Sequence, residues 1–76
     1  MSKAIEDAEH AKNILADEMF QRIFKSLEER LKATWKMTEP QDNEKREELY
    51  YELRALDSIQ KKLVGYVENG IIEMKR

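Results

Sequence analysis

Residues 49–67 read LYYELRALDSIQKKLVGYV, and this stretch decides the fold. Its aliphatic side chains recur at alternating steps of four and three residues, with Gln60 filling one slot of the pattern. Such steps keep side chains on one stripe of an α-helix. The stripe consists of Leu49, Leu53, Leu56, Leu63 and Val67. The stretch therefore predicts an amphipathic helix with a coiled-coil-like apolar seam.

The residues that flank this stretch set the expected ends of the helix. The side chain of Asp42 or Asn43 can accept a hydrogen bond from a free N–H of the first turn, so the helix is expected to begin near residue 43. Asn69-Gly70 is typical of a helix stop, because glycine readily adopts the left-handed conformation. We therefore expect a helix over about 43–69 and a short tail over 70–76.

The upstream half of the chain predicts a second, longer helix. Neither glycine nor proline precedes Pro40, which lies in the turn-like cluster TEPQDN at 38–43. We expect a helix over about 2–36 and a turn over about 37–42. A connection this short makes two helices antiparallel neighbours. The predicted fold is all-α, a single domain over 1–76 built as an antiparallel two-helix hairpin with a longer first helix.

The longer helix carries two apolar stripes. One stripe is expected to pack against the second helix, and the predicted hairpin core comprises Phe20, Phe24, Leu27, Leu31, Trp35, Leu49, Leu53, Leu56, Leu63 and Val67. The other stripe, nearer the amino terminus, comprises Ile5, Ala8, Ala11, Leu15 and Met19. At about 100° per residue, the two stripes point roughly 120° apart. A straight helix with one partner needs only one stripe, so the second stripe indicates a second contact.

The register of the hairpin suggests what that second contact is. If Leu31 lies opposite Leu53, the second helix ends opposite about residues 13–17, and about a dozen residues of the first helix extend past it, or roughly 18 Å. The tail over 70–76 or another subunit must cover this overhang. Small chains without disulfides usually gain stability by oligomerisation. We therefore expect the stripe from Ile5 to Met19 to be the interface of a homodimer or higher oligomer that completes a helical bundle.

Composition argues against several classes of function. The 76 residues include 14 basic and 16 acidic side chains, one histidine, two glycines and no cysteine. No glycine-rich phosphate loop occurs and no serine has an adjacent base, so we assign no catalytic residue and no cofactor and expect no enzyme activity. The net charge of −2 lacks the basic excess typical of nucleic-acid binding, so nucleic acid is not an expected partner. No apolar run approaches the roughly 18 residues of a membrane span.

One pattern resembles a metal site. Asp7 and His10 are spaced as Asp-x-x-His, with Glu6 one turn before His10. Carboxylate-bridged metal centres in helical bundles use two such pairs, and a symmetric dimer would supply the second. Because one chain supplies one pair only, we interpret His10 as a solvated or capping residue and assign no metal ligand.

The aromatic residues near the turn allow two interpretations. Trp35, Tyr50 and Tyr51 either form a partner-binding patch or include a tryptophan that closes the end of the core, and we favour the second. Tyr50 and Tyr51 point about 100° apart, so at least one is exposed. Basic residues also gather here, interspersed with acidic ones: Lys25, Arg30, Lys32, Lys36, Lys45 and Arg46. For Gln60 both a register-fixing buried position and a solvated edge position stay open.

Residues 35–72 contain four short motifs in order. They are W-x-x-T at Trp35–Thr38, R-E-x-L-Y at Arg46–Tyr50, L-x-A-L-D at Leu53–Asp57 and N-G at Asn69-Gly70. This half of the chain resembles small uncharacterised helical-hairpin proteins of tailed bacteriophages and prophages. The resemblance implies a virion-assembly or accessory protein in the cytoplasm of a bacterial host or in the virion, and it brings no catalytic residues.

Three functions follow as hypotheses. The first is a non-enzymatic, self-associating helical protein, a phage structural or assembly component whose partners are itself and a larger phage or host protein. The second is a small phage-encoded inhibitor that binds a host protein by placing a helix in a groove. The third is a ferritin-like, metal-binding hairpin oligomer.

Overall fold

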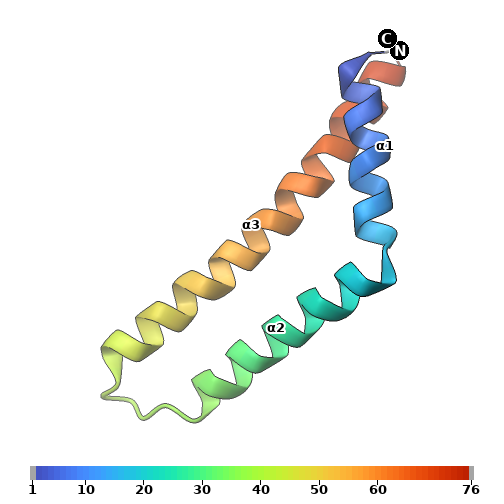
Figure 1. Ribbon diagram of the computed structural model, residues 1–76. Helices are drawn as coiled ribbons and strands as arrows, with labels where there is room; N and C mark the ends of the chain where they lie inside the picture. The colour runs from blue at the N-terminus through green and yellow to red at the C-terminus, as the bar shows by residue number, and fades with distance from the viewer. Residues whose placement is uncertain (1, 76) are drawn as a thin grey trace.

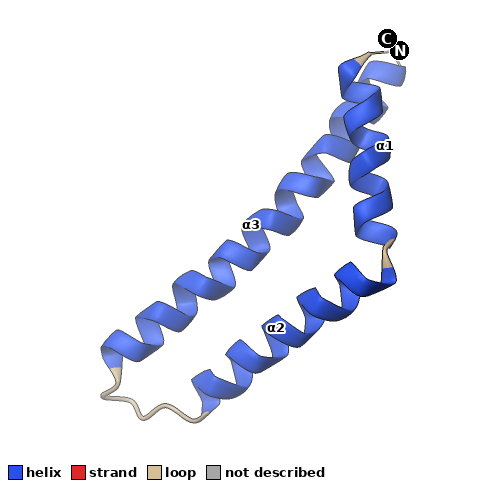
Figure 2. Cartoon of the chain, in the orientation of Figure 1, coloured by secondary structure: helices blue, strands red, loops and turns tan. Residues whose placement is uncertain are grey.

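The computed structural model describes residues 2–75, which form three helices (Figure 1). These are α1 (Lys3–Ala16), α2 (Glu18–Lys36) and α3 (Asn43–Met74), and no strand occurs among the described residues (Figure 2). The all-α prediction is confirmed. The two-helix hairpin is only partly right, because α2 and α3 form a hairpin while α1 is a separate helix that bends back onto the far end of α3.

The predicted single helix over about 2–36 is wrong, because the chain breaks at Asp17. This residue is extended, with φ −68° and ψ 125°, and its carboxylate accepts a hydrogen bond from the backbone N–H of Phe20 at 2.8 Å. Its own N–H donates to the carbonyl of Ile14 at 3.2 Å, and the Gln21 side chain donates to the carbonyl of Leu15 at 2.8 Å. Groups left free at both helix ends thus find partners, which makes the break stable. The resulting elbow explains why the two apolar stripes point in different directions.

The predicted stop at Asn69-Gly70 is also wrong, since α3 continues to Met74. Gly70 does not have a positive φ angle, so it does not act as a left-handed helix end. It is buried against α1, where a Cβ atom would collide with the Cβ of Ala8 and lie 3.3 Å from the carbonyl oxygen of Ala4. The glycine therefore serves close helix packing. Because α3 reaches this far, α1 does not overhang it, and the expected uncovered segment is covered by the same chain.

The turn between α2 and α3 lies where the sequence predicts it. Asp42 is the N-cap of α3, but its carboxylate accepts from the backbone N–H of Glu39 at 2.9 Å and makes no cap hydrogen bond to the helix. On the α2 side, the Thr38 hydroxyl donates to the carbonyl of Trp35 at 2.6 Å and accepts from Nε of Arg46 at 2.8 Å. These bonds tie the end of α2 to the start of α3.

The molecule is elongated, with extents of 53 × 23 × 14 Å, and α2 and α3 lie beside each other in one layer (Figure 1). The radius of gyration is 16.5 Å, whereas a compact chain of this length has about 11 Å. The exposed area is 6334 Å², about 1,400 Å² more than expected for a compact monomer of 9.1 kDa. Stable domains are usually built from at least two packed layers, whereas within residues 2–75 only α1, at the far end of α3, packs on the α2–α3 layer.

Few large side chains are fully buried. Among the described residues the buried hydrophobic ones are Ala8, Ala11, Leu31 and Leu49. Of the predicted hairpin core, Leu31 and Leu49 are thus buried, Trp35 is exposed, and the rest are half-buried: Phe20, Phe24, Leu27, Leu53, Leu56, Leu63 and Val67. Most of the predicted core residues are therefore only partly shielded, and Leu63 lies beside Ala11 and Ile14 of α1.

Candidate interaction surfaces

The predicted oligomer stripe is split between two places. Ala8 and Ala11 are buried, and the Gly70 contact places Ala8 in the boundary between α1 and α3. Ile5 and Leu15 on α1 are half-buried, while Met19 lies beyond the elbow on α2 and is exposed. A single chain does not test association between copies, so that interface stays a prediction. The two alanines of the stripe, however, are already buried within one chain, and Ala8 lies against Gly70 of α3.

The two faces of the α2–α3 layer differ in chemistry. In antiparallel helices that pack seam to seam, residues one position before the seam residues share one face of the pair, and residues one position after share the other. Seam residues Phe20 and Phe24 are preceded by Met19 and Ile23, and Gln60 is preceded by Ile59. Ile23 and Ile59 are 52% and 49% exposed.

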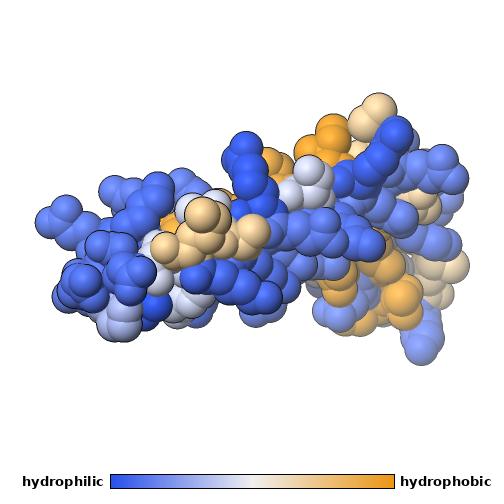
Figure 3. All heavy atoms as spheres, turned by 90° about the horizontal axis from the view of Figure 1, so that it is seen from below, coloured by the Kyte–Doolittle hydropathy of each residue, from blue (hydrophilic) through white to orange (hydrophobic). Residues whose placement is uncertain are grey.

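We name this surface the isoleucine face and define it by Met19, Ile23, Ala55 and Ile59. It also carries charges of both signs, with Arg30 on α2 and Glu52 on α3. Figure 3 views the molecule from below and shows hydrophobic residues gathered at the end away from the turn, whereas the turn end is mostly hydrophilic. In this view the apolar surface is therefore concentrated at the end of the molecule away from the turn.

The opposite face contains a shallow hollow near the turn. Lys32, Trp35 and Lys36 line it from α2, and Tyr50 and Leu53 line it from α3, around a volume of about 310 Å³. Trp35 is 37% exposed and Tyr50 is 49% exposed. We call this surface the turn-end hollow. Its floor is apolar and its α2 rim carries two ammonium groups.

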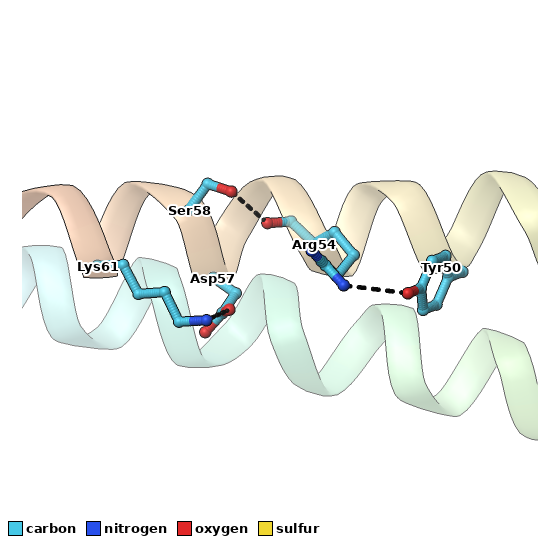
Figure 4. Close-up of polar contacts among 5 residues, drawn as sticks. All are labelled: Tyr50, Arg54, Asp57, Ser58 and Lys61. Carbon is cyan, nitrogen blue, oxygen red and sulfur yellow. Dashed lines mark hydrogen bonds and ion pairs between the residues drawn. The ribbon is translucent and has the colours of Figure 1, made fainter.

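The aromatic walls of the hollow are held by neighbouring side chains. The Arg46 guanidinium lies 4.8 Å from the centre of the Trp35 ring, and its Nε–H bond to Thr38 fixes it there. On α3, Nη1 of Arg54 donates to the Tyr50 hydroxyl at 3.1 Å, and its guanidinium lies 5.8 Å from that ring (Figure 4). Both aromatic residues are thus restrained by cation–π contacts and hydrogen bonds.

The charges at the turn end are segregated. Lys32 forms an ion pair with Glu28 at 3.4 Å. Within residues 2–75 no carboxylate lies within 4 Å of the Lys36 ammonium group. The acidic residues Glu44, Glu47 and Glu48 line a different recess together with Tyr51. The Tyr51 hydroxyl donates to Glu47 at 3.2 Å. Both tyrosines are exposed, but Tyr50 lies beside basic residues and Tyr51 lies beside acidic ones.

The residues suspected of metal binding do not gather. Asp7 forms an ion pair with Lys3 at 3.6 Å, and exposed His10 lies beside them in a recess that also includes Tyr66 of α3. Across residues 2–75 no group of three or more histidine, cysteine, aspartate or glutamate side chains could hold a metal ion. Gln60 is exposed, as expected for the solvated edge of the seam.

Sequence reasoning singled out Trp35 and Tyr50 but not the full surfaces. The two seam stripes do not include Ile23 or Ile59, and composition groups Lys32 and Lys36 with the other basic residues near the turn. The signal was present in the chain: each of these four residues stands directly before or after a seam position. The position of a residue relative to the seam decides on which face its side chain lies. The composition of the whole turn end combines the charges of both faces and so hides the difference between them.

No family model, curated protein or solved structure matches this chain. Within residues 2–75, every helix is too polar or too short to cross a membrane.

Proposed function

We propose that this protein is a non-enzymatic helical module that works by self-association through its isoleucine face. The observation that carries the proposal is the single-layer shape. The chain exposes about 1,400 Å² beyond a compact monomer, which exceeds the roughly 800 Å² that each partner buries in a standard interface. A second copy laid on the isoleucine face would supply a second layer and cover that side of the half-buried seam.

Symmetry makes a second copy a suitable occupant. In a two-fold dimer the same patch meets itself, so a patch must be self-complementary. The isoleucine face offers aliphatic side chains at its centre, Ile23 and Ile59, together with a basic and an acidic residue, Arg30 and Glu52. Two copies would form a helical bundle. The resemblance of residues 35–72 to small phage helical-hairpin proteins is the reason why we propose a role in virion assembly.

The mass in solution tests this proposal. Light scattering coupled to gel filtration, over about 1 to 100 µM protein, should give at least twice the chain mass of 9.1 kDa. The double substitution Ile23→Asp with Ile59→Asp should return the mass to that of one chain, while far-UV circular dichroism retains the helical spectrum. The reason is that both residues are about half exposed, so the charges cost little within one chain and much in an interface.

A matched control uses exposed apolar residues outside the isoleucine face. Met37 in the turn and Tyr51 on the acidic side are exposed, and their replacement by aspartate should leave the mass unchanged. A wild-type chain that stays monomeric at every concentration would refute the proposal, and so would an oligomer that survives the isoleucine substitutions.

A further inference from the structure

The turn-end hollow has features that self-association through the isoleucine face does not use. Lys32, Lys36 and Tyr50 directly follow the seam positions Leu31, Trp35 and Leu49, so they occupy the face opposite to Ile23 and Ile59. A copy docked on the isoleucine face would therefore leave the hollow open. The hollow is a separate surface, and an inference about it does not depend on the proposed oligomer.

We propose that the turn-end hollow binds an acidic segment of another protein that presents one aliphatic side chain between carboxylates. The rings of Trp35 and Tyr50 and the side chain of Leu53 line an apolar floor with which one such side chain could make contact. The ammonium groups of Lys32 and Lys36, one helical turn apart, flank that floor and would meet the carboxylates, with Lys32 giving up its ion pair with Glu28. Aromatic anchors beside cations are typical of the residues that dominate protein interfaces.

The hollow is organised before any ligand arrives. Thr38 accepts a hydrogen bond from Arg46, the Arg46 guanidinium lies over the Trp35 ring, and Arg54 donates a hydrogen bond to Tyr50. The backbone of Arg54 is in turn engaged by the Ser58 hydroxyl, which donates to its carbonyl at 2.9 Å (Figure 4). Binding would thus order few side chains, and the entropy lost on association would be small.

Charge decides between a peptide and a nucleic acid. Stacked aromatic rings with nearby cations also suit single-stranded nucleic acid, whose affinity grows with every phosphate neutralised. Here the cations available at the hollow are few, the neighbouring recess is lined by Glu44, Glu47 and Glu48, and the whole chain has a net charge of −2. A long polyanion would be repelled by these carboxylates. A short acidic segment needs only the two lysines.

The single tryptophan of the chain provides the test, because Trp35 lines the hollow and its fluorescence reports occupancy. The full-length protein is titrated with the synthetic peptide acetyl-DDLDD-amide, and we expect a saturable change of emission. Replacement of Lys32 and Lys36 by glutamate should weaken binding about tenfold or more, since two ion pairs are lost. Tyr50→Ala should weaken it on the order of tenfold through loss of the apolar wall. Added salt should weaken binding by the wild type.

Matched controls separate the hollow from general electrostatics. Lys12→Glu with Lys75→Glu changes the net charge equally but lies on α1 and at the far end of α3, so binding should stay within about twofold. The peptides acetyl-DDSDD-amide and acetyl-KKLKK-amide should not saturate the signal. The proposal is overturned if acetyl-DDLDD-amide gives no saturable change, if either control peptide binds as well, or if an oligothymidine binds more tightly.

Discussion

Helix α3 packs against its two neighbours in opposite ways. Along its carboxyl-terminal part its backbone approaches α1 so closely that Gly70 has no room for a Cβ atom beside Ala8. Along its amino-terminal part it approaches α2 much less closely, and large side chains such as Phe24 and Leu53 remain half-buried between the two helices. One stripe of a single helix thus supports a tight crossing and an open seam.

The difference shows how side-chain size sets the state of an interface. Small residues let two helix backbones come together, so a pair of helices excludes water without further help. Large residues keep the backbones apart, and two helices then shield each side chain on one side only. The α1–α3 crossing already buries Ala8 and Ala11 within one chain, whereas the α2–α3 seam leaves most of its large side chains half-buried. This is the reason for placing the proposed second copy on the α2–α3 layer and not on α1.

The largest effect is expected in the α2–α3 seam at its buried point. Leu49 is buried, so Leu49→Ala should lower the free energy of unfolding by about 3 kcal/mol through lost burial and a cavity. Leu53→Ala, at a half-buried position one turn later, should cost about half as much. Urea denaturation followed by circular dichroism, at one fixed protein concentration, measures both.

The pair of leucine variants also sharpens the comparison between the two regions. Leu53 lines the turn-end hollow, which a copy on the isoleucine face leaves open, so the cost of Leu53→Ala should stay about half that of Leu49→Ala as protein concentration rises. Equal and small losses at both positions would mean that the seam contributes little to stability, and the contrast drawn here would be wrong.

A somewhat smaller effect is expected at the tight crossing. Gly70→Ala should lower the free energy of unfolding by about 2 kcal/mol, because the added Cβ collides with Ala8 and outweighs the gain in helix propensity. Gly65→Ala is the matched control in the same helix. A Cβ there meets nothing within 4 Å, so this change should raise the free energy of unfolding by up to about 1 kcal/mol. A lower melting temperature for Gly70→Ala and a higher one for Gly65→Ala would confirm the tight crossing. A Gly70→Ala variant that is more stable than the wild type would contradict it.

Much of this contrast was predictable from the chain. The all-α class, the turn over 37–42 and the seam from Leu49 to Val67 follow from periodicity and from Pro40 with its polar neighbours. The end of α3 was not predicted, because Asn69-Gly70 matches a common stop signal. Yet positions 63, 67, 70 and 74 continue the steps of four and three, so the seam pattern already favoured a longer helix. A glycine inside a seam serves packing, and only the presence of a partner helix distinguishes that from a stop.

The sequence indicated part of the elbow's effect, a second contact of the first helical segment, but not the break at Asp17. Two stripes roughly 120° apart are incompatible with one straight helix on one partner, and that conflict indicated a second contact. The conflict was resolved within the chain by Asp17 and not by another subunit. Aspartate in a helical pattern competes for backbone N–H groups, but whether it caps a new helix depends on tertiary packing of the segment before it. The turn-end hollow likewise depends on pairing Lys32 and Lys36 of one helix with Tyr50 of another.

The smallest of the expected effects concerns this elbow, which connects the two regions. Asp17→Ala removes the carboxylate that accepts from the N–H of Phe20, and the loss of an N-cap should lower the free energy of unfolding by about 1 kcal/mol. Asp17→Ser retains an acceptor oxygen and should stay within a few tenths of a kcal/mol of the wild type. Thermal melts of both variants give the comparison. Because alanine also favours a continuous helix across the elbow, α1 would then turn away from α3, and Ala8 would lose its contact with Gly70. Combining Asp17→Ala with Gly70→Ala should therefore cost less than the sum of the two changes, and strict additivity would show that the elbow and the crossing are independent.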